Sequence, residues 1–129
     1  MSKQRRRILL IDDEDDIREV VQLSLEMTAA WEVLAASSGK EGVAKAESEK
    51  PDAILLDVMM PELDGPATLK LLKANPAIRG IPVVLLTAKV HSAERSRFSE
   101  LGAAAVMTKP FDPLKLASEI AEALGWAPL

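Results

Sequence analysis

The chain has 129 residues, of which 48% are hydrophobic and 28% charged, and it contains no cysteine. This composition fits one domain with an apolar core and excludes disulfide bridges, zinc–thiolate sites, iron–sulfur clusters and a cysteine nucleophile. The formal net charge is −4 although four basic residues lie at the start of the chain, namely Lys3, Arg5, Arg6 and Arg7. Because the rest of the chain is therefore acidic, we expect no direct binding to nucleic acid.

The first apolar run of the chain is too short for a membrane or secretion segment. A bilayer span needs roughly 20 apolar residues and a secretion signal ~7–15, whereas the basic tract is followed only by Ile8 to Ile11. We expect a cytoplasmic protein without a membrane partner. The whole chain, 1–129, is predicted to form a single domain with a solvated basic lead-in at 1–6 and a C-terminal tail at 125–129.

Short apolar runs alternate with longer amphipathic stretches along the chain. In chain order they predict strand 8–11, helix 17–27, strand 31–36, helix 39–49, strand 53–56, helix 66–75, strand 82–86, helix 92–101, strand 103–107 and helix 113–124. Boundary residues support these limits. The residues at 37–39 and Asp64 are predicted to cap helices, Gly102 to end one, and the pair at 112–113 to open the last.

Strict alternation of strands and helices favours parallel βαβ units with right-handed crossovers. We therefore predict an α/β fold, an open and doubly wound sheet of five parallel strands with helices on both faces. In such sheets the functional groups lie beyond the carboxyl ends of the strands.

Polar side chains follow four of the predicted strands: Asp12 and Asp13, Asp57, Thr87, and Thr108 and Lys109. Because crowded carboxylates repel one another, this group needs a cation or a retained proton. Oxygen ligands open to solvent suit Mg²⁺, or Mn²⁺ in its place. The set fits an aspartate that attacks phosphorus while a metal ion and Lys109 offset the charge on the phosphoryl oxygens.

Helix capping, or a favourable interaction with the helix dipole, is the alternative role for acids that follow a strand. We assign only that role to the acids at 14–16. For Asp12 or Asp13 alone, capping and function stay equally open. Asp57 differs, because the residues at 58–61 that follow it begin no helix.

Four motifs at these strand ends resemble those of response-regulator receiver domains of the stand-alone, chemotaxis type. They are Ile11-Asp12-Asp13, Asp57-Val58-Met59-Met60-Pro61-Glu62-Leu63-Asp64-Gly65, Leu86-Thr87-Ala88 and Lys109-Pro110-Phe111. The resemblance covers nearly the whole chain. It implies a flavodoxin-like sheet in the order 2-1-3-4-5 and a cis peptide bond between Lys109 and Pro110.

The resemblance also implies a phosphoacceptor in a two-component or phosphorelay system. Asp57 would accept a phosphoryl group from a phosphohistidine of a histidine kinase or phosphotransfer protein. Mg²⁺ would be held by Asp12, Asp13, Asp57 and the backbone carbonyl of Met59.

Three further residues would contact the phosphoryl group. Thr87 would hydrogen-bond it, Lys109 would pair with it, and Ala88 would be the small residue beside it. Such a protein is not an enzyme, although it assists its own phosphorylation and dephosphorylation. Its output would be read by a separate protein, and we expect a monomer or a dimer that forms on phosphorylation.

Three positions bear on output and on the lifetime of the phosphorylated state, and at one of them the sequence departs from the family. Many members carry an aromatic residue where this chain has Val106, so we expect output through 89–101 or the first helix instead. Met59 and Lys89 occupy positions that tune the lifetime of the acyl phosphate, and we expect slow hydrolysis.

Two other functions remain as alternatives. The first is a pseudo-receiver that acts as a scaffold without being phosphorylated, which the intact polar residues disfavour. The second is a phosphatase of the haloacid-dehalogenase class, which also forms an aspartyl phosphate. That class needs an acid two residues after its nucleophile, where this chain has Met59.

Overall fold

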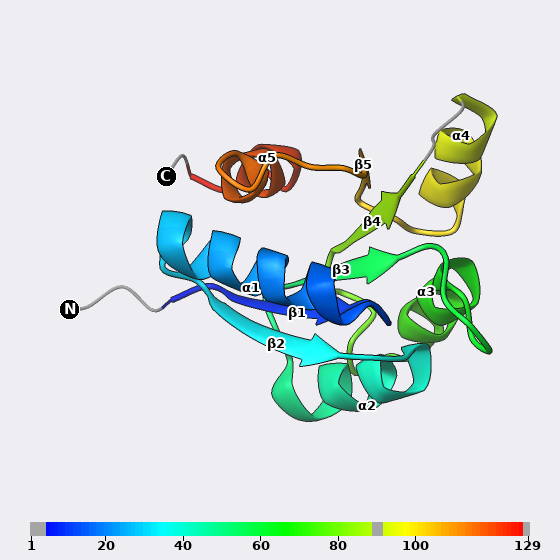
Figure 1. Ribbon diagram of the computed structural model, residues 1–129. Coiled ribbons are helices and arrows are strands. Elements are labelled where there is room, and N and C mark those ends of the chain that lie inside the picture. Colours follow the sequence, from blue (N-terminus) through cyan, green and yellow to red (C-terminus); the bar gives the residue numbers. More distant parts are fainter. Residues whose placement is uncertain (1–4, 89–91, 128–129) are drawn as a thin grey trace.

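A parallel sheet in the strand order β2-β1-β3-β4-β5 forms the centre of the protein, in a computed structural model that describes residues 5–88 and 92–127. The strands are β1 (Arg7–Ile11), β2 (Glu32–Ala36), β3 (Ala53–Asp57), β4 (Val83–Thr87) and β5 (Ala105–Thr108). The helices are α1 (Asp15–Ala29), α2 (Gly39–Glu49), α3 (Gly65–Ala74), α4 (Ser92–Glu100) and α5 (Leu116–Ala123). The predicted α/β fold and strand order are confirmed (Figure 1).

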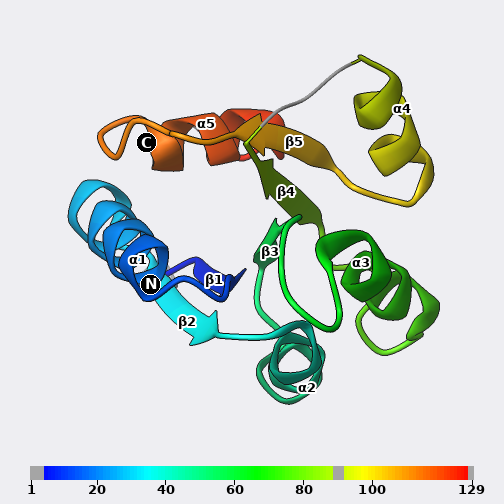
Figure 2. The same ribbon diagram turned by 45° about the vertical axis from the view of Figure 1, so that its right-hand side comes forward.

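Helices cover both faces of the sheet, with α1 and α5 on one face and α2, α3 and α4 on the other (Figure 2). In β1, Ile8 and Leu10 pack in the cluster with α1 and α5, whereas Leu9 and Ile11 pack in the cluster with the other helices. Successive strand residues point to opposite faces, so a strand covered on both faces is apolar throughout. None of the helices in the described part of the chain has the length and hydropathy needed to cross a membrane.

The register of the strands brings their polar neighbours to one edge of the sheet. Ile11, the last residue of β1, pairs with Leu56 of β3, and Asp57 ends β3 one residue further on. Thr87 ends β4 opposite Thr108, the last residue of β5. The segments that follow β1, β3, β4 and β5 therefore start from a common edge.

Most predicted boundaries agree with the structure within two residues. The Ser38 side chain accepts a hydrogen bond from the N–H of Glu41 at 3.1 Å, and the Asp64 side chain accepts one from the N–H of Ala67 at 2.9 Å. Gly102 has a φ of +105°, which glycine adopts without strain. The caps of α2 and α3 were therefore predicted correctly.

The predicted start of the last helix, at 112–113, is wrong. The Asp112 side chain accepts a hydrogen bond from the N–H of Leu114 at 2.9 Å. Its carbonyl accepts bonds from the N–H groups of Lys115 and Leu116 at 2.9 and 3.0 Å. These bonds form a separate turn, so the regular helix begins at Leu116.

Of the basic lead-in, the structure describes Arg5 and Arg6, which are exposed and make specific contacts. Arg5 Nε donates to the carbonyl of Ala30 at 2.7 Å. The Arg6 guanidinium lies 4.1 Å from the ring centroid of Trp126, and that ring meets Trp31 edge to face at 5.4 Å. The two arginines thus bind the start of the chain to the end of α1 and to the residues after α5.

Candidate functional site

Asp57 lies at the end of β3 with its carboxyl group buried. Its side chain is 3% exposed, and Lys109 Nζ lies 3.2 Å from Oδ1. The same Nζ lies 3.1 Å from Oδ2 of Asp12, whose side chain is fully buried. One ammonium group therefore bridges the carboxylates that follow two neighbouring strands, β1 and β3.

Asp12 is fixed by hydrogen bonds to each of its polar groups. Its N–H donates to the carbonyl of Ala36 at 3.1 Å, which extends the pairing of β1 and β2 by one residue. Oδ1 accepts from the N–H of Glu14 at 2.9 Å, and the backbone carbonyl accepts from Arg18 Nη1 at 2.7 Å. With Lys109 on Oδ2, the carboxylate cannot turn without breaking hydrogen bonds.

Asp57 is held less completely. Oδ1 accepts from Lys109 and, at 3.4 Å, from the N–H of Met59, whereas Oδ2 is buried and has no hydrogen-bond partner in the described part of the chain. Burial raises the pKa of Asp57 above its ordinary value of 3.8, and the charge of Asp12 raises it further, against the smaller opposing effects of Lys109 and the Met59 N–H. One oxygen is thus anchored while the other is left with its hydrogen-bonding capacity unsatisfied.

Lys109 stays protonated at neutral pH. Burial lowers its pKa, but the charges and hydrogen bonds of Asp12 and Asp57 outweigh burial and raise the pKa above 10.5. Burial is the main reason that the pKa of Asp57 is raised, and the charge of Asp12 adds to it, whereas the pKa of Lys109 is raised by the two carboxylates that it contacts. One positive charge thus faces two buried carboxylates. The site therefore favours an additional cation.

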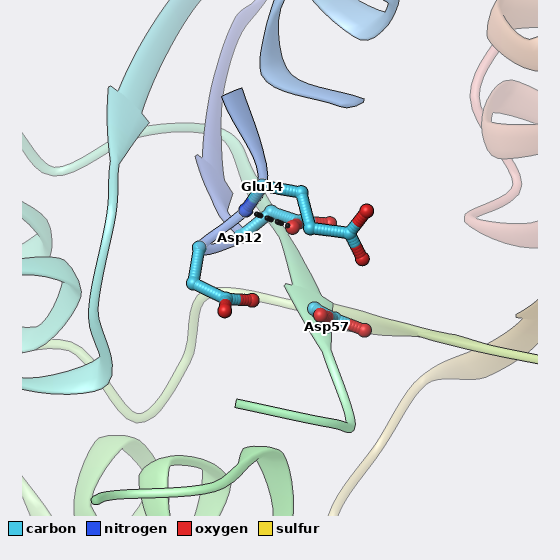
Figure 3. A group of neighbouring side chains, drawn as sticks. Asp12, Glu14 and Asp57 are labelled. Atoms are coloured by element: carbon cyan, nitrogen blue, oxygen red, sulfur yellow. Dashed lines mark hydrogen bonds between the residues drawn. The ribbon is translucent and has the colours of Figure 1, made fainter. Parts of the chain in front are cut away.

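Four acidic residues form a group that can hold a metal ion: Asp12, Asp13, Glu14 and Asp57. One ligand oxygen of each lies within 4.8 Å of the others, and the exposed pair, Asp13 and Glu14, opens the group to solvent. Figure 3 shows Asp12, Glu14 and Asp57 gathered beyond the ends of β1 and β3. Oxygen ligands of this kind suit Mg²⁺, and the unpartnered Oδ2 of Asp57 is an acceptor that a cation would satisfy.

Glu14 belongs to this acidic group, although the sequence analysis did not place it among the metal ligands. The prediction for it was only a role in capping or in the helix dipole; Glu14 is the N-cap residue of α1, and its side chain makes no capping hydrogen bond. Its carboxylate instead belongs to the acidic group. The run of acids at 13–16 contained no signal that separated Glu14 from its neighbours.

The remaining predicted residues border this group. Thr87 ends β4 and is buried, and its carbonyl accepts the backbone N–H of Lys109 at 2.8 Å. Ala88 follows it and is exposed, while the Met59 side chain is 74% exposed. The Lys109–Pro110 peptide bond is cis, as predicted. Contacts of Thr87, Ala88 and the Met59 carbonyl with bound groups stay predictions.

Of the residues on which the predictions about output and lifetime rest, the structure describes Val106 and Met59. Val106 is half-buried and packs against the apolar cluster that contains Phe98. Lys89 lies outside the described residues, as do Lys3 and the first part of the segment 89–101. The expectations of slow hydrolysis and of output without an aromatic switch therefore stay predictions.

The start of α3 packs directly against the end of β3. The N–H of Gly65 donates to the carbonyl of Val58 at 3.0 Å. A Cβ atom at Gly65 would lie 2.6 Å from both the Asp57 carbonyl oxygen and the Val58 Cα. Only glycine permits this approach, which closes the loop 58–64 onto the strand that carries Asp57.

Known proteins are similar to this chain over most of its length. The family model of the response regulator receiver domain matches residues 8–121. The alkaline phosphatase synthesis transcriptional regulatory protein PhoP of Bacillus subtilis is 41% identical over 115 residues, which are 89% of this chain and 47% of that protein. The phosphate regulon transcriptional regulatory protein PhoB of Pseudomonas aeruginosa is 37% identical over 115 residues, 89% and 50% of the two chains. The chain thus spans about half the length of these relatives.

Two solved structures share this fold over nearly the whole of both aligned chains. The chemotaxis protein CheY4 of Vibrio cholerae aligns with a TM-score of 0.87 and 28% identity, covering 93% of this chain and 99% of that one. A putative response regulator from Chloroflexus aurantiacus aligns with a TM-score of 0.85 and 30% identity, covering 95% and 99%. On the family match, the sheet order and the acids at the strand ends, the chain belongs to the response regulator receiver domain family.

Proposed function

We propose that the chain is a phosphoacceptor switch in which Asp57 receives a phosphoryl group from a phosphohistidine, with Mg²⁺ bound beside it. The main support for the proposal is the environment of the Asp57 carboxyl group. It is buried, anchored through Oδ1 by Lys109, and unpartnered at Oδ2. A structural carboxylate at the end of a strand would instead have both oxygens satisfied.

The transfer exchanges one bond to phosphorus for another. A bond forms between a carboxylate oxygen of Asp57 and phosphorus, the phosphorus–nitrogen bond of the phosphohistidine breaks, and its electron pair stays on the imidazole nitrogen. Water later attacks the acyl phosphate, which releases inorganic phosphate and restores the carboxylate. The protein is modified and restored in this cycle, so it acts as a switch and not as an enzyme with an external substrate.

The protein's own residues would position the donor phosphoryl group and offset its charge. Lys109 already lies at Oδ1 of Asp57 and would pair with a phosphoryl oxygen. Thr87 would donate its hydroxyl hydrogen, and Ala88 would leave space for the group. Asp12, Asp13 and the Met59 carbonyl would hold Mg²⁺, which would supply the positive charge that the two buried carboxylates lack.

The phosphodonor would dock on α1. Large apolar side chains are exposed there and on the segment before α5: Val20 by 39%, Leu23 by 58%, Met27 by 81% and Leu114 by 80%. They border a surface hollow of about 370 Å³. Because α1 follows Asp12 and Asp13, and Leu114 lies between Lys109 and α5, the hollow adjoins both segments that carry site residues. Exposed apolar patches of this kind commonly bind protein partners.

Acetyl phosphate with Mg²⁺ tests phosphorylation without a kinase. We expect intact mass spectrometry to show the addition of one phosphoryl group to the wild type and none to Asp57→Ala. Addition to Asp57→Ala would place the acceptor elsewhere. No addition to the wild type, together with unchanged NMR spectra in beryllofluoride, would favour the unphosphorylated scaffold.

The docking surface has a separate test. We expect Leu23→Glu to reduce the rate of transfer from a phosphorylated kinase or phosphotransfer protein and to leave phosphorylation by acetyl phosphate unchanged. Leu71→Glu is the matched control, because Leu71 is also exposed, by 48%, but lies on α3. Equal effects of the two substitutions on transfer would contradict docking on α1.

A further inference from the structure

We infer that Arg18 is a positioning residue for the Mg²⁺ site, an inference that rests on the proposed function. Arg18 lies in the first turns of α1, and its side chain is only 20% exposed. Nη1 donates to the backbone carbonyl of Asp12 at 2.7 Å, and Nη2 donates to the carboxylate of Asp15. The guanidinium thus reaches back from the helix to the end of β1, where the acidic group begins.

The contact of Arg18 with the Asp12 carbonyl orients the peptide between the two predicted metal ligands. The peptide unit is planar, so fixing the direction of the Asp12 carbonyl also fixes the direction in which the chain continues to Asp13. The other partners of Asp12 hold its N–H and its carboxylate. Among the described residues, only Arg18 donates to this carbonyl, so it sets the position of Asp13 relative to Asp12.

The pair with Asp15 makes this positioning compatible with cation binding. A free guanidinium this close to the acidic group would repel Mg²⁺. Asp15 lies three residues before Arg18 on the same helix and pairs with it, which offsets that positive charge locally. Arg18 can therefore hold the carbonyl while contributing little net positive charge to the site.

The planar fork of arginine suits this double contact. Its two terminal nitrogens reach the carbonyl and the carboxylate at the same time. A lysine at this position would keep the charge but offers one nitrogen on a flexible stem, without the fixed geometry of the fork. Arg18→Lys thus removes most of the positioning and retains the charge.

Whether substitution of Arg18 strengthens or weakens Mg²⁺ binding distinguishes a positioning role of this residue from a purely electrostatic one. If the charge of Arg18 were its only influence, Arg18→Gln would strengthen Mg²⁺ binding and Arg18→Lys would leave it unchanged. Positioning predicts weaker binding in both variants. Residues that orient metal ligands typically contribute 10- to 100-fold to affinity, so we expect the Kd for Mg²⁺ to rise about 10-fold.

The experiment measures the Kd for Mg²⁺ by calorimetry in the wild type, Arg18→Lys, Arg18→Gln and the control Arg97→Gln, whose residue is exposed on α4. The thermal midpoint of each protein is measured without Mg²⁺. We expect weaker binding in both Arg18 variants and no change in the control.

Three results bear on the inference in different ways. Mg²⁺ binding by both Arg18 variants as tight as in the wild type, or tighter, would overturn it, whatever happens to the thermal midpoint. If Arg18→Gln fails to fold, the Kd for Mg²⁺ of the charge-retaining variant Arg18→Lys tests the inference by itself. Absence of Mg²⁺ binding by the wild type would instead contradict the proposed function.

Discussion

The Lys109 ammonium donates to one oxygen of Asp57, at 3.2 Å from Oδ1, and leaves Oδ2 buried without a partner in the described part of the chain. Lys109 divides its contacts between this carboxylate and that of Asp12. The two buried carboxylates therefore share one positive charge, which leaves a net negative charge. This excess of negative charge favours cation binding and lowers the stability of the metal-free protein.

Asp57→Asn should stabilise the protein in the absence of Mg²⁺. The substitution keeps the size of the side chain and removes one of two buried negative charges that share a single lysine. We expect the free energy of unfolding at neutral pH to rise on the order of 1 kcal/mol, measured from urea unfolding curves. Mg²⁺ should then stabilise the wild type more than the variant. A variant less stable than the metal-free wild type would contradict this excess of negative charge.

The same carboxyl group should make stability depend on pH. Because the folded-state pKa of Asp57 is raised above 3.8, the native state binds more protons than the unfolded state between the two values. Stability is then highest below the unfolded pKa and falls as pH rises through the raised pKa. The stability difference between Asp57→Asn and the wild type, measured without Mg²⁺, should grow as the pH rises from the unfolded-state pKa through the raised folded-state pKa, and then level off. A constant difference would show that Asp57 does not titrate in this way.

The cap of α2 offers a test of the fold away from the site. Ser38 accepts from the N–H of Glu41, and the Glu41 carboxylate accepts from the N–H of Ser37 at 2.6 Å. Ser38→Ala should lower the free energy of unfolding by about 0.5–2 kcal/mol. Ser48→Ala is the control, because Ser48 is an exposed residue at the other end of the same helix. Equal stability losses would show that the cap contributes nothing.

Gly65→Ala should disturb the strand end that carries Asp57. The added methyl group would lie 2.6 Å from the Asp57 carbonyl oxygen, so we expect a loss of about 1–3 kcal/mol in stability and weaker Mg²⁺ binding. Gly80→Ala is the matched control, since a Cβ atom there meets nothing within 4 Å. Urea unfolding and calorimetry measure the two effects. A Gly65→Ala variant as stable as Gly80→Ala would contradict the close approach of α3 to β3.

The sheet and the core of the site could be predicted because both depend on short-range patterns. Unbroken apolar runs mark strands buried on both faces, and the first polar residue after each run lies at the carboxyl edge. The sequence alone therefore places Asp57, Thr87 and, directly after Thr108, Lys109 at this edge. The order of the strands came from the family resemblance, since alternation alone leaves several orders open.

The remaining features depend on contacts that no local pattern encodes. Glu14 follows Asp13 in a run of acids, and only the path of the turn brings its carboxylate to the group. The sequence does not distinguish Arg18 from other polar residues of an amphipathic helix; only its hydrogen bond to the Asp12 carbonyl does. The contact between Arg6 and Trp126 joins residues that are far apart in the sequence. The pair at 112–113 has the composition of a helix start, but its hydrogen bonds close a turn before α5.

Titration of Mg²⁺ into the purified protein, followed by NMR, tests the central claim most directly. We predict saturable shifts of the backbone amide signals of Asp12, Asp13, Met59 and Lys109, and little change near Trp31 and Trp126 at the opposite end of the sheet. Asp57→Ala should weaken the response. Signals around Asp57 that stay unchanged at saturating Mg²⁺ would contradict the claim that its buried carboxylate and its acidic neighbours form a metal-binding phosphoacceptor site.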